Sequence, residues 1–266
     1  SPALFKAGYD GRYPYELIET PDFEEAYSRF LNEYDGINVT APFKELAYSK
    51  ADILSEECKV IKATNLLVKT PEGIKAYNSD YLGVQMWLRE VAEGWESVLP
   101  PWPQGEGPTT KEWEGFFSTP LPPHTAVKAL IVGLGGAGKA AAAAAESLGM
   151  EVIRMNRTIR DGQTRPLSDF RECFREADII IYNIPAAIPE MNGLTDSDFT
   201  PGRPKHIMEA NYRNPSFDEN LIKKMKEANP LAEYTGGRTW LLYQALTGYE
   251  IFTGEKPDLE KMSTVL

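Results

Sequence analysis

The stretch Ala129-Leu-Ile-Val-Gly-Leu-Gly-Gly-Ala-Gly-Lys-Ala140 decides the fold of this chain of 266 residues. Four apolar residues run into clustered glycines, and an alanine-rich, helix-forming segment follows through Leu148. A second apolar run covers residues 151–155 and ends at Asn156-Arg157-Thr158. Strand, glycine turn, helix and strand in this order form the unit that places a dinucleotide pyrophosphate at a helix N-terminus. The sequence therefore predicts a nucleotide-dependent enzyme.

Strand and helix signals continue to alternate after this turn, which predicts a parallel sheet with helices on both faces. Ser216-Phe-Asp-Glu219 has the pattern of a capping box that opens a helix toward Ala228. Residues 239–252 repeat apolar side chains at helical spacing. The strand candidates of this part of the chain are residues 129–132, 151–155, 179–182, 206–209 and 231–234.

The part of the chain before residue 93 also alternates. It predicts a helix over residues 22–32 with Asp22 as its N-cap, and a hairpin around Thr70-Pro71-Glu72-Gly73. A second helix is expected over residues 81–91. The strand candidates are residues 13–18, 36–40, 66–69 and 74–77.

Two domains and a connection follow from this pattern. Residues 93–124 are dense in proline and contain Trp95, Trp102 and Trp113, so we expect an inter-domain linker with a long insertion that packs on the protein. The predicted organisation is a substrate-binding and catalytic domain over residues 1–92, with residues 238–266 packing back on it, and a Rossmann-like cofactor domain over residues 125–237.

Composition excludes several function classes. The net charge of −11 and the pI of about 4.9 disfavour nucleic acid and anionic membranes as partners, because both need a basic face. No apolar run approaches the ~20 residues that span a bilayer. Two cysteines and two histidines make neither a disulfide scaffold nor a zinc site. We expect a cytoplasmic monomer or homodimer without a metal, acting on a small molecule.

The glycine turn and the strand after it indicate the cofactor. Gly133 and Gly135 would allow the turn and a close phosphate approach, and Gly136, Ala137 and Gly138 would open the helix with free N–H groups. The alternative is a turn with a purely structural role.

The end of the second strand favours NADP over NAD. NAD sites place an acidic residue about 20 positions after the glycines, to bind the ribose hydroxyls. Here Asn156, Arg157 and Thr158 take that place. Arg157 would pair with a 2′-phosphate, and Thr158 could donate to it. The alternative is that Arg157 is a solvated surface charge.

Three polar motifs precede the linker. They are Asn38-Val-Thr-Ala-Pro-Phe-Lys44, Ala63-Thr-Asn65 and Gly73-Ile-Lys-Ala-Tyr-Asn-Ser-Asp80. Each has a structural explanation when taken alone; Asp80, for example, could be the N-cap of the helix that follows it.

Together with the glycine turn, these motifs give the chain a resemblance to the shikimate dehydrogenase family that covers nearly its whole length. Several independent motifs occur in the order that the family shows. The matching stretches are Asn38 to Lys44, Lys62 to Leu66, Asn78-Ser79-Asp80, Gly133 to Ala137, Asn156 to Thr158, Tyr212 to Pro215 and Gly237 to Gln244.

The resemblance implies a two-domain α/β enzyme that reduces 3-dehydroshikimate to shikimate with NADPH, in chorismate and aromatic amino acid biosynthesis. It makes Lys44 and Asp80 the catalytic pair and places Gly237 near the nicotinamide. Hydride transfer to a ketone builds charge on oxygen, and a lysine held by a carboxylate can meet that charge and supply a proton. The substrate-binding residues that the resemblance implies are Ser1, Asn38, Thr40, Asn65, Tyr212 and Gln244.

The chain also departs from the family pattern. It starts at Ser1-Pro2, where the family has a strand and Ser-x-Ser-Pro, so either the start is truncated or that strand was not retained. Asn183-Ile184-Pro185 replaces the family's Asn-Ala-Thr, and Trp240 stands where methionine is usual. Two alternatives stay open: a quinate/shikimate dehydrogenase that prefers NAD, and a non-catalytic ligand-binding protein on the same scaffold.

Overall fold

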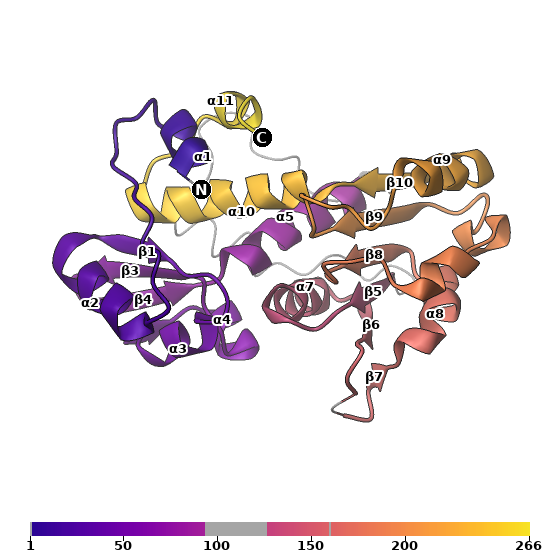
Figure 1. The fold of residues 1–266 in the computed structure, drawn as a ribbon, viewed down its shortest axis with the longest axis horizontal. Helices are drawn as coiled ribbons and strands as arrows, with labels where there is room; N and C mark the ends of the chain where they lie inside the picture. The colour runs from indigo at the N-terminus through magenta and orange to yellow at the C-terminus, as the bar shows by residue number, and fades with distance from the viewer. Residues whose placement is uncertain (1, 94–126, 160) are drawn as a thin grey trace. The chain divides into compact units, whose positions relative to one another are not determined.

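The computed structural model describes residues 2–93, 127–159 and 161–266, so Ser1 and most of the proline- and tryptophan-rich segment lie outside the described residues. The chain forms two compact units (Figure 1). Unit 1 runs from the N-terminus to Met86 and resumes at Leu242. Unit 2 begins at Trp87 and ends at Leu241. Among the described residues, the chain changes unit inside two helices, α5 (Ser79–Glu93) and α10 (Gly237–Thr253).

Unit 1 is built on a small mixed sheet. Its strand order is β1-β3-β4-β2, in which β3 pairs antiparallel with β1 and β4, and β2 runs parallel to β4. The predicted hairpin is confirmed, with Leu66 opposite Tyr77 and Thr70 opposite Gly73. Its further elements are α1 (Pro2–Gly8), α2 (Phe23–Glu33), β1 (Gly36–Asn38), α3 (Lys44–Ser49), β2 (Ile53–Leu54), α4 (Glu56–Ile61), β3 (Leu66–Thr70), β4 (Gly73–Tyr77) and α11 (Leu259–Ser263).

Helix α2 covers this sheet because its apolar side chains recur at helical spacing. Phe23 and Phe30 are buried with Leu67 of β3 and Ala76 of β4. The helix begins where the sequence predicts, since the Asp22 side chain accepts a hydrogen bond of 2.9 Å from the Glu24 N–H.

The strand predicted over residues 13–18 is wrong. No strand is assigned there, and the segment pairs with none of the strands that the structure describes. Instead, Tyr13 and Tyr15 pack their rings on Phe5, with centroids 6.5 Å and 4.8 Å away. The alternation of apolar residues thus marks one-sided aromatic packing rather than a place in a sheet.

Unit 2 is a doubly wound sheet of six strands, all parallel, in the order β10-β9-β8-β5-β6-β7. The two halves of the sheet start from the neighbouring strands β5 and β8, which is the order of dinucleotide-binding folds. The predicted fold class is therefore confirmed. The elements are β5 (Lys128–Val132), α7 (Gly136–Ser147), β6 (Glu151–Met155), β7 (Thr164–Arg165), η1 (Leu167–Asp169), α8 (Phe170–Glu176), β8 (Ile179–Tyr182), η2 (Pro189–Gly193), η3 (Asp196–Phe199), β9 (Lys205–Glu209), α9 (Glu219–Ala228) and β10 (Ala232–Thr235).

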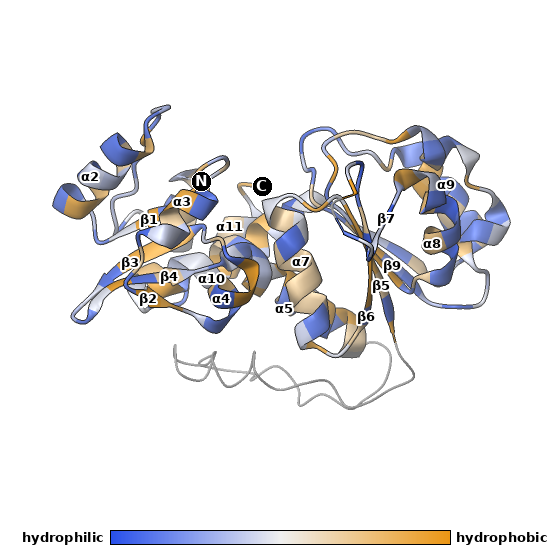
Figure 2. Cartoon of the chain, turned by 90° about the horizontal axis from the view of Figure 1, so that it is seen from below, coloured by the Kyte–Doolittle hydropathy of each residue, from blue (hydrophilic) through white to orange (hydrophobic). Residues whose placement is uncertain are grey.

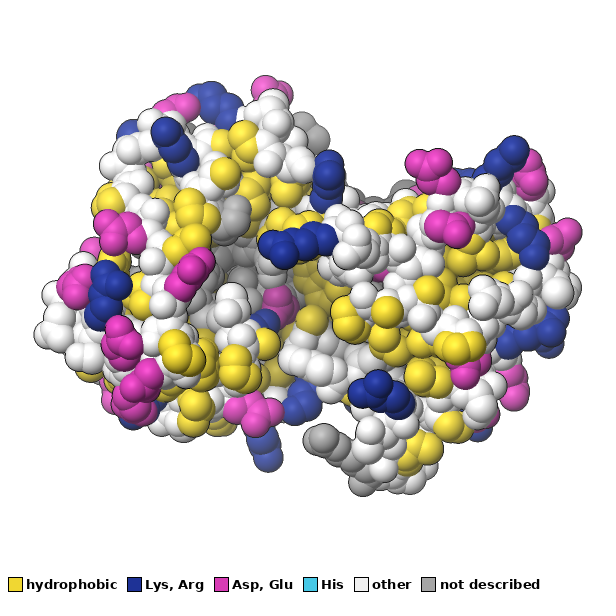
Figure 3. Space-filling model, in the orientation of Figure 1, with side chains coloured by type: hydrophobic (Ala, Val, Ile, Leu, Met, Phe, Trp, Pro, Cys, Tyr) yellow, Lys and Arg dark blue, Asp and Glu magenta, His cyan; other side chains and the backbone are white. Residues whose placement is uncertain are grey.

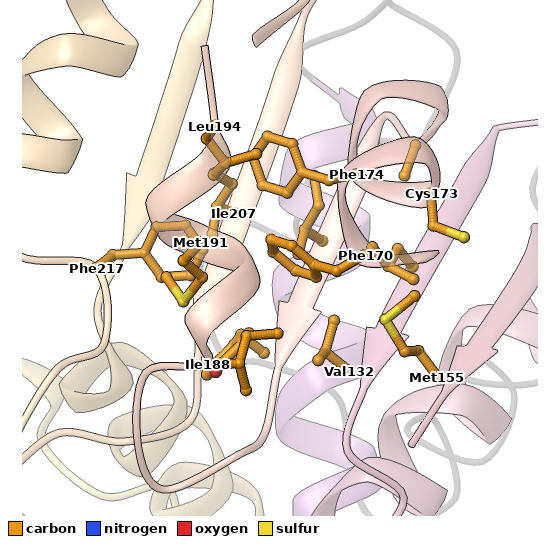
Figure 4. Packing of buried hydrophobic residues seen from close by; sticks show 14 of the residues in the cluster. Val132, Met155, Phe170, Cys173, Phe174, Ile188, Met191, Leu194, Ile207 and Phe217 are labelled. Atoms are coloured by element: carbon orange, nitrogen blue, oxygen red, sulfur yellow. The ribbon is translucent and has the colours of Figure 1, made fainter. Parts of the chain in front are cut away.

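Helices cover both faces of this sheet. Helix α7 lies on one side, and α8 and α9 lie on the other (Figures 1 and 2). On the second side, Phe170 and Phe174 of α8 pack against Val132 and Ile207 of the sheet (Figure 4). Helix α7 is apolar along most of its length because alanines fill it, whereas α9 is mostly polar and carries a few apolar residues (Figure 2). Alanine lets α7 lie close to the strands that carry the glycine turn.

Two details of unit 2 differ from the sequence pattern. Helix α9 is capped by Asp218, whose side chain accepts from the Leu221 N–H at 2.8 Å, so the predicted capping box on Ser216 is wrong. The Ser216 N–H is instead bound by the carboxylate of Glu209. Strand β7 has only two residues, too few for a periodic signal.

Candidate functional site

Lys44 and Asp80 form an ion pair inside unit 1. Lys44 opens α3 and Asp80 lies in the first turn of α5, and Lys44 Nζ is 2.5 Å from Asp80 Oδ2. Their side chains are 20% and 9% exposed. The dipole of α3 disfavours the positive charge of Lys44 at the start of the helix. The Asp80 carboxylate offsets this unfavourable interaction and also holds the ammonium in place. The arrangement holds the ammonium in place and leaves it partly open to solvent.

Backbone and side-chain hydrogen bonds bring the three polar motifs together around this pair. The Thr64 N–H donates to the Lys44 carbonyl at 3.0 Å, and the Val39 N–H donates to the Asn65 carbonyl at 2.8 Å. The Asn65 side chain binds Ser79 twice, accepting from its N–H at 2.8 Å and donating to its Oγ at 3.0 Å. Asn65 therefore fixes the start of α5, next to Asp80.

The N-cap interpretation of Asp80 does not hold. The side chain of Asn78 accepts from the Tyr81 N–H at 3.1 Å and so satisfies the first turn of α5. The Asp80 carboxylate is thereby left for Lys44.

The remaining predicted substrate residues of unit 1 are Asn38, Thr40 and Gln244. Asn38 ends β1 and donates from Nδ2 to the hydroxyl of Tyr15 at 2.9 Å. Thr40 is exposed, with the carbonyl of Ala41 3.5 Å from its hydroxyl. Gln244 lies in α10 against α5, because a Cβ added to Gly83 would meet the Gln244 backbone nitrogen at 2.7 Å.

The glycine turn of unit 2 follows β5, at the carboxyl edge of the sheet where its two halves diverge. Gly133 has a φ of +88°, which favours glycine. A Cβ on Gly138 would stand 1.8 Å from the Gly133 carbonyl oxygen, so only glycine fits at the start of α7. Gly135 differs, because a Cβ there would meet no atom within 4 Å.

These features fit a dinucleotide. Gly136 and Ala137 begin α7, whose N-cap Gly135 supplies no side-chain hydrogen bond, so its first N–H groups are left for an anion. The open space at Gly135 is what a closely approaching phosphate needs. Beside the turn, Asn183 Oδ1 is buried without a hydrogen-bond partner among the described residues, and it can accept from a bound ligand.

Asn156, Arg157 and Thr158 follow β6 at the same edge of the sheet. The Asn156 side chain donates to the Thr158 carbonyl at 3.1 Å and so shapes the loop. Arg157 is exposed and forms no ion pair with any residue that the structure describes. Arg154, by contrast, is bound by Glu146. Of these two arginines, Arg157 is the one left for an added anion.

Tyr212 and Gly237 meet in unit 2. A Cβ on Gly237 would be 2.6 Å from the Ala210 carbonyl oxygen and 2.9 Å from the carbonyl carbon of Asn211. The start of α10 thus packs on the backbone that leads into Tyr212, an exposed residue. The structure gathers Lys44, Asp80, Asn38, Thr40, Asn65 and Gln244 in unit 1, and the glycine turn, Arg157, Tyr212 and Gly237 in unit 2. Ser1 lies outside the described residues.

Sequence reasoning missed Glu209, which shapes the loop that carries Tyr212. Glu209 ends β9 and is fully buried. Its carboxylate accepts from the N–H groups of Ser216 at 2.5 Å and Phe217 at 3.2 Å, and from the hydroxyl of Tyr234 at 2.9 Å. A glutamate after a strand gives no signal for such a role, because its three donors come from distant or irregular segments.

Replacing Glu209 with Gln should lower the free energy of unfolding by about 1–3 kcal/mol, because an amide nitrogen would then face backbone donors in a buried site. Urea denaturation measures this change. Glu233→Gln is the matched control: Glu233 lies on β10 with its side chain 66% exposed, and its replacement should cost less than about 0.5 kcal/mol. Equal stability of the two variants would contradict a structural role for Glu209.

The described residues hold no cluster of three or more potential metal-ligating side chains. Among them, no helix is both long and apolar enough to span a membrane. Acidic and basic side chains are interspersed over the face drawn in Figure 3, and those described there form no broad basic patch. The candidate residues of unit 1 are amides, hydroxyls and one ion pair, and those of unit 2 are backbone N–H groups, Arg157 and the Tyr212 hydroxyl.

Two family models match parts of the chain. The shikimate dehydrogenase substrate binding domain matches residues 1–67. The NAD binding domain of D-isomer specific 2-hydroxyacid dehydrogenases matches residues 109–208. The stretch that matches the first model includes the first polar motif and Asn65, and the stretch that matches the second model includes the glycine turn.

Relatives and solved structures extend the similarity over the whole chain. Shikimate dehydrogenase (NADP(+)) of Carboxydothermus hydrogenoformans is 25% identical over 95% of this chain and 84% of its own length. The enzyme of the same name from Syntrophobacter fumaroxidans is 30% identical over 87% of this chain and 73% of its own. The structure of shikimate 5-dehydrogenase from Thermus thermophilus in complex with NADP(H) and shikimate shares the fold, with a TM-score of 0.70 at 22% identity over 99% of this chain and 92% of that one. This chain belongs to the shikimate dehydrogenase family.

Proposed function

We propose that this protein reduces 3-dehydroshikimate to shikimate with NADPH, in a reversible hydride transfer. The observation that carries the proposal is the ion pair of Lys44 and Asp80, in which a lysine ammonium is held 2.5 Å from a carboxylate that is 9% exposed. The relatives named shikimate dehydrogenase (NADP(+)) support the choice of substrate and cofactor. In this proposal, unit 1 supplies the catalytic pair and unit 2 binds the cofactor.

Lys44 would act on the carbonyl oxygen of the substrate. NADPH supplies the hydride when bound. As the C–H bond forms, negative charge builds on the carbonyl oxygen, and the Lys44 ammonium can stabilise that charge and then transfer its proton to it. Asp80 orients the ammonium through the hydrogen bond between them. Atoms and charge balance, because the ketone gains one hydride and one proton.

The polar side chains around the pair suit a polyhydroxylated acid. Asn38, Asn65, Thr40 and Gln244 offer both donors and acceptors, which a substrate with several hydroxyls requires. In the Asn65 side chain, one N–H of Nδ2 and the oxygen Oδ1 are already hydrogen-bonded to Ser79. A hydrogen bond from Asn65 to the substrate would therefore come from the second N–H of its amide. Tyr212, on the loop that Glu209 closes, is proposed as a further substrate contact, and Gly237 as a close neighbour of the nicotinamide.

NADP is the proposed cofactor because the loop after β6 offers a cation where an NAD site needs a carboxylate. Arg157→Ala should raise the KM for NADPH about 10- to 100-fold, since charged hydrogen bonds to a phosphate contribute about 1.5–3 kcal/mol. The KM for NADH should stay the same, because NADH lacks the 2′-phosphate. Steady-state assays with both cofactors measure this split.

Arg203→Ala is the control for the loss of an exposed arginine. Arg203 pairs with Asp178 at the amino edge of the sheet, away from the glycine turn. The Arg203→Ala substitution should leave the KM for NADPH and the KM for NADH unchanged. If Arg157→Ala instead raises the KM for NADPH and the KM for NADH equally, Arg157 does not bind the 2′-phosphate.

The proposed function is tested by mixing the full chain with NADPH and 3-dehydroshikimate and following absorbance at the NADPH band. A decrease that depends on the substrate supports it. Turnover of quinate with NAD, and none with NADPH, would instead favour a quinate/shikimate dehydrogenase. Binding of shikimate and NADPH with no turnover in either direction would favour a non-catalytic protein.

A further inference from the structure

The loop of residues 210–215, which we call the Tyr212 loop, follows β9 in unit 2. Both of its ends are fixed to the sheet. The Ala210 N–H donates to the Tyr182 carbonyl at 2.8 Å, and the first N–H group after the loop donates to the carboxylate of Glu209 at 2.5 Å. Between these ends, Tyr212 and the three residues after it are exposed. An exposed loop segment has little apolar packing, so side-chain hydrogen bonds can decide its conformation.

The side chain of Asn211 makes four hydrogen bonds at the start of this loop. Its Nδ2 donates to the carbonyl of Asn214 at 2.6 Å and to the carbonyl of Pro185 at 3.1 Å. Its Oδ1 accepts from the N–H groups of Arg213 and Asn214, both at 3.2 Å. A carbonyl oxygen only accepts and a backbone N–H only donates, so these partners determine which end of the amide is which. Three of the four bonds stay within the Tyr212 loop, and the bond to Pro185 leaves it.

Pro185 is a fixed partner for this amide. It lies in the loop after β8, and its neighbours are bound to the sheet on both sides. The Asn183 N–H donates to the Val132 carbonyl at 2.7 Å. The hydroxyl of the fully buried Tyr182 donates to the Ala186 carbonyl, also at 2.7 Å. The Pro185 carbonyl therefore offers a stable point to which a neighbouring loop can be held.

The same two loops lie beside the proposed cofactor-binding residues of unit 2. A Cβ on Gly133 would stand 2.9 Å from the side chain of Ile184, in the loop after β8. A Cβ on Gly237 would stand 2.9 Å from the carbonyl carbon of Asn211. The hydrogen bond between Asn211 and Pro185 thus joins two loops at the carboxyl edge of the sheet, where doubly wound folds bind their ligands.

We propose that Asn211 is a positioning residue, which holds the Tyr212 loop to the loop after β8 and so fixes the place of the Tyr212 side chain. The guanidinium of Arg213 lies 5.6 Å from the centroid of the Tyr212 ring, so the backbone that Asn211 binds also carries the group packed on that ring. The inference rests on the proposed function, in which Tyr212 contacts the substrate.

Asn211→Asp separates the link between the two loops from the turn within the Tyr212 loop. Aspartate can still accept from the N–H groups of Arg213 and Asn214, as it does in such turns. Its second oxygen would face the Pro185 carbonyl without a proton to donate, so the link is lost. The KM for 3-dehydroshikimate should rise about 3- to 10-fold, as expected for one hydrogen bond. The kcat should change little, because the Tyr212 contact serves the ground state and the transition state alike.

Asn211→Ala loses the link and the turn together without adding a charge. Its KM for 3-dehydroshikimate should rise at least as much as that of Asn211→Asp. A raised KM in Asn211→Ala alone would mean that only the turn matters, and it would overturn the proposed link. A raised KM in Asn211→Asp alone would be an effect of the added negative charge, and it would overturn the proposal too.

Asn192→Asp is the matched control. It makes the same chemical change in the same unit, at an exposed residue of η2. This variant should keep the wild-type KM and kcat. An equal rise of the KM in Asn192→Asp and Asn211→Asp would mean that the position of the asparagine does not matter, and it would contradict a specific role for Asn211.

A double-mutant cycle tests whether Asn211 acts through Tyr212. Tyr212→Phe removes the hydroxyl that is proposed to meet the substrate. In this background, Asn211→Ala should not raise the KM further. Additive effects of the two substitutions would overturn the positioning role, because Asn211 would then act on the substrate by another route.

The hydrogen bonds of Asn211 are also tested without turnover. In 15N-labelled protein, the side-chain amide signals of Asn211 and Asn192 are identified by their loss in Asn211→Ala and Asn192→Asp. The Asn211 protons should exchange with water about 10-fold more slowly than those of Asn192, because both are hydrogen-bonded. Equal exchange rates would overturn the inference even in an active enzyme. Slow exchange in a wild-type protein without turnover would instead refute the proposed function and, with it, the role of Asn211 toward the substrate.

Discussion

Lys44→Ala should lower kcat for the reduction of 3-dehydroshikimate by about 1000-fold or more, and leave the affinity for NADPH unchanged. General acid catalysis contributes about 100- to 10,000-fold, and loss of the cation also removes stabilisation of the charge on the carbonyl oxygen. The cofactor is untouched because the proposed NADPH-binding residues lie in unit 2 and Lys44 lies in unit 1. Absorbance at the NADPH band gives kcat, and quenching or enhancement of NADPH fluorescence gives the dissociation constant.

Two further variants test whether this loss of activity comes from the loss of the Lys44 ammonium. Lys44→Met keeps most of the side-chain volume and should be as inactive as the alanine variant. This result would show that the loss of the ammonium, and not a cavity left by alanine, abolishes activity. Lys50→Ala removes a lysine that follows the same helix and pairs with Glu24 of α2 at 2.8 Å, and it should retain wild-type kcat. Substantial turnover by Lys44→Met would exclude Lys44 as the proton donor.

Gly138→Ala should raise the dissociation constant for NADPH about 100-fold or more and lower the free energy of unfolding by about 3 kcal/mol. Its Cβ would lie 1.8 Å from the Gly133 carbonyl oxygen, a backbone atom that no rotamer change can move away. The turn would have to open, and the N–H groups at the start of α7 would leave their places around the phosphate. Calorimetric titration with NADPH and urea denaturation measure the two effects.

Gly193→Ala is the matched control for this change. It adds the same methyl group in unit 2, at the end of η2, where no atom lies within 4 Å. Stability and NADPH affinity should both match the wild type. Gly135→Ala is a further test. This variant should fold normally. If it nevertheless binds NADPH more weakly than the wild type, the phosphate lies at that residue. Normal NADPH binding by Gly138→Ala would mean that the cofactor does not use this turn.

Much of unit 2 could be predicted from sequence, because apolar runs bounded by turn residues identify buried parallel strands. The five predicted strands correspond to β5, β6, β8, β9 and β10, shifted by at most one residue at either end. Strand β7 was not predictable, since two residues carry no period. The segment around Tyr13 and Tyr15 was mispredicted because alternation reports which side is buried, and not whether a partner strand is available.

The site was predictable only in part. Lys44 and Asp80 are 36 positions apart, and nothing in their own neighbourhoods indicates that they meet; the resemblance to a family suggested the pair, and the structure brings the side chains into contact. The links from Asn38 to Tyr15 and from Glu209 to the loop with Tyr212 had no sequence signal. Each joins a strand end to an irregular segment, where the position of a side chain depends on packing from elsewhere in the chain.

The ion pair of Lys44 and Asp80 lies in unit 1 and the glycine turn lies in unit 2, and this separation bears on how such enzymes diversify. A lineage can alter the coenzyme it consumes by changing a few positions after β6, without disturbing the ammonium and its carboxylate. It can equally acquire a new metabolite by editing the ends of β1, β3 and β4 while its coenzyme stays the same. Residues 1–67 match a substrate binding domain and residues 109–208 match an NAD binding domain, so the two kinds of change would fall in separately matched parts of the chain.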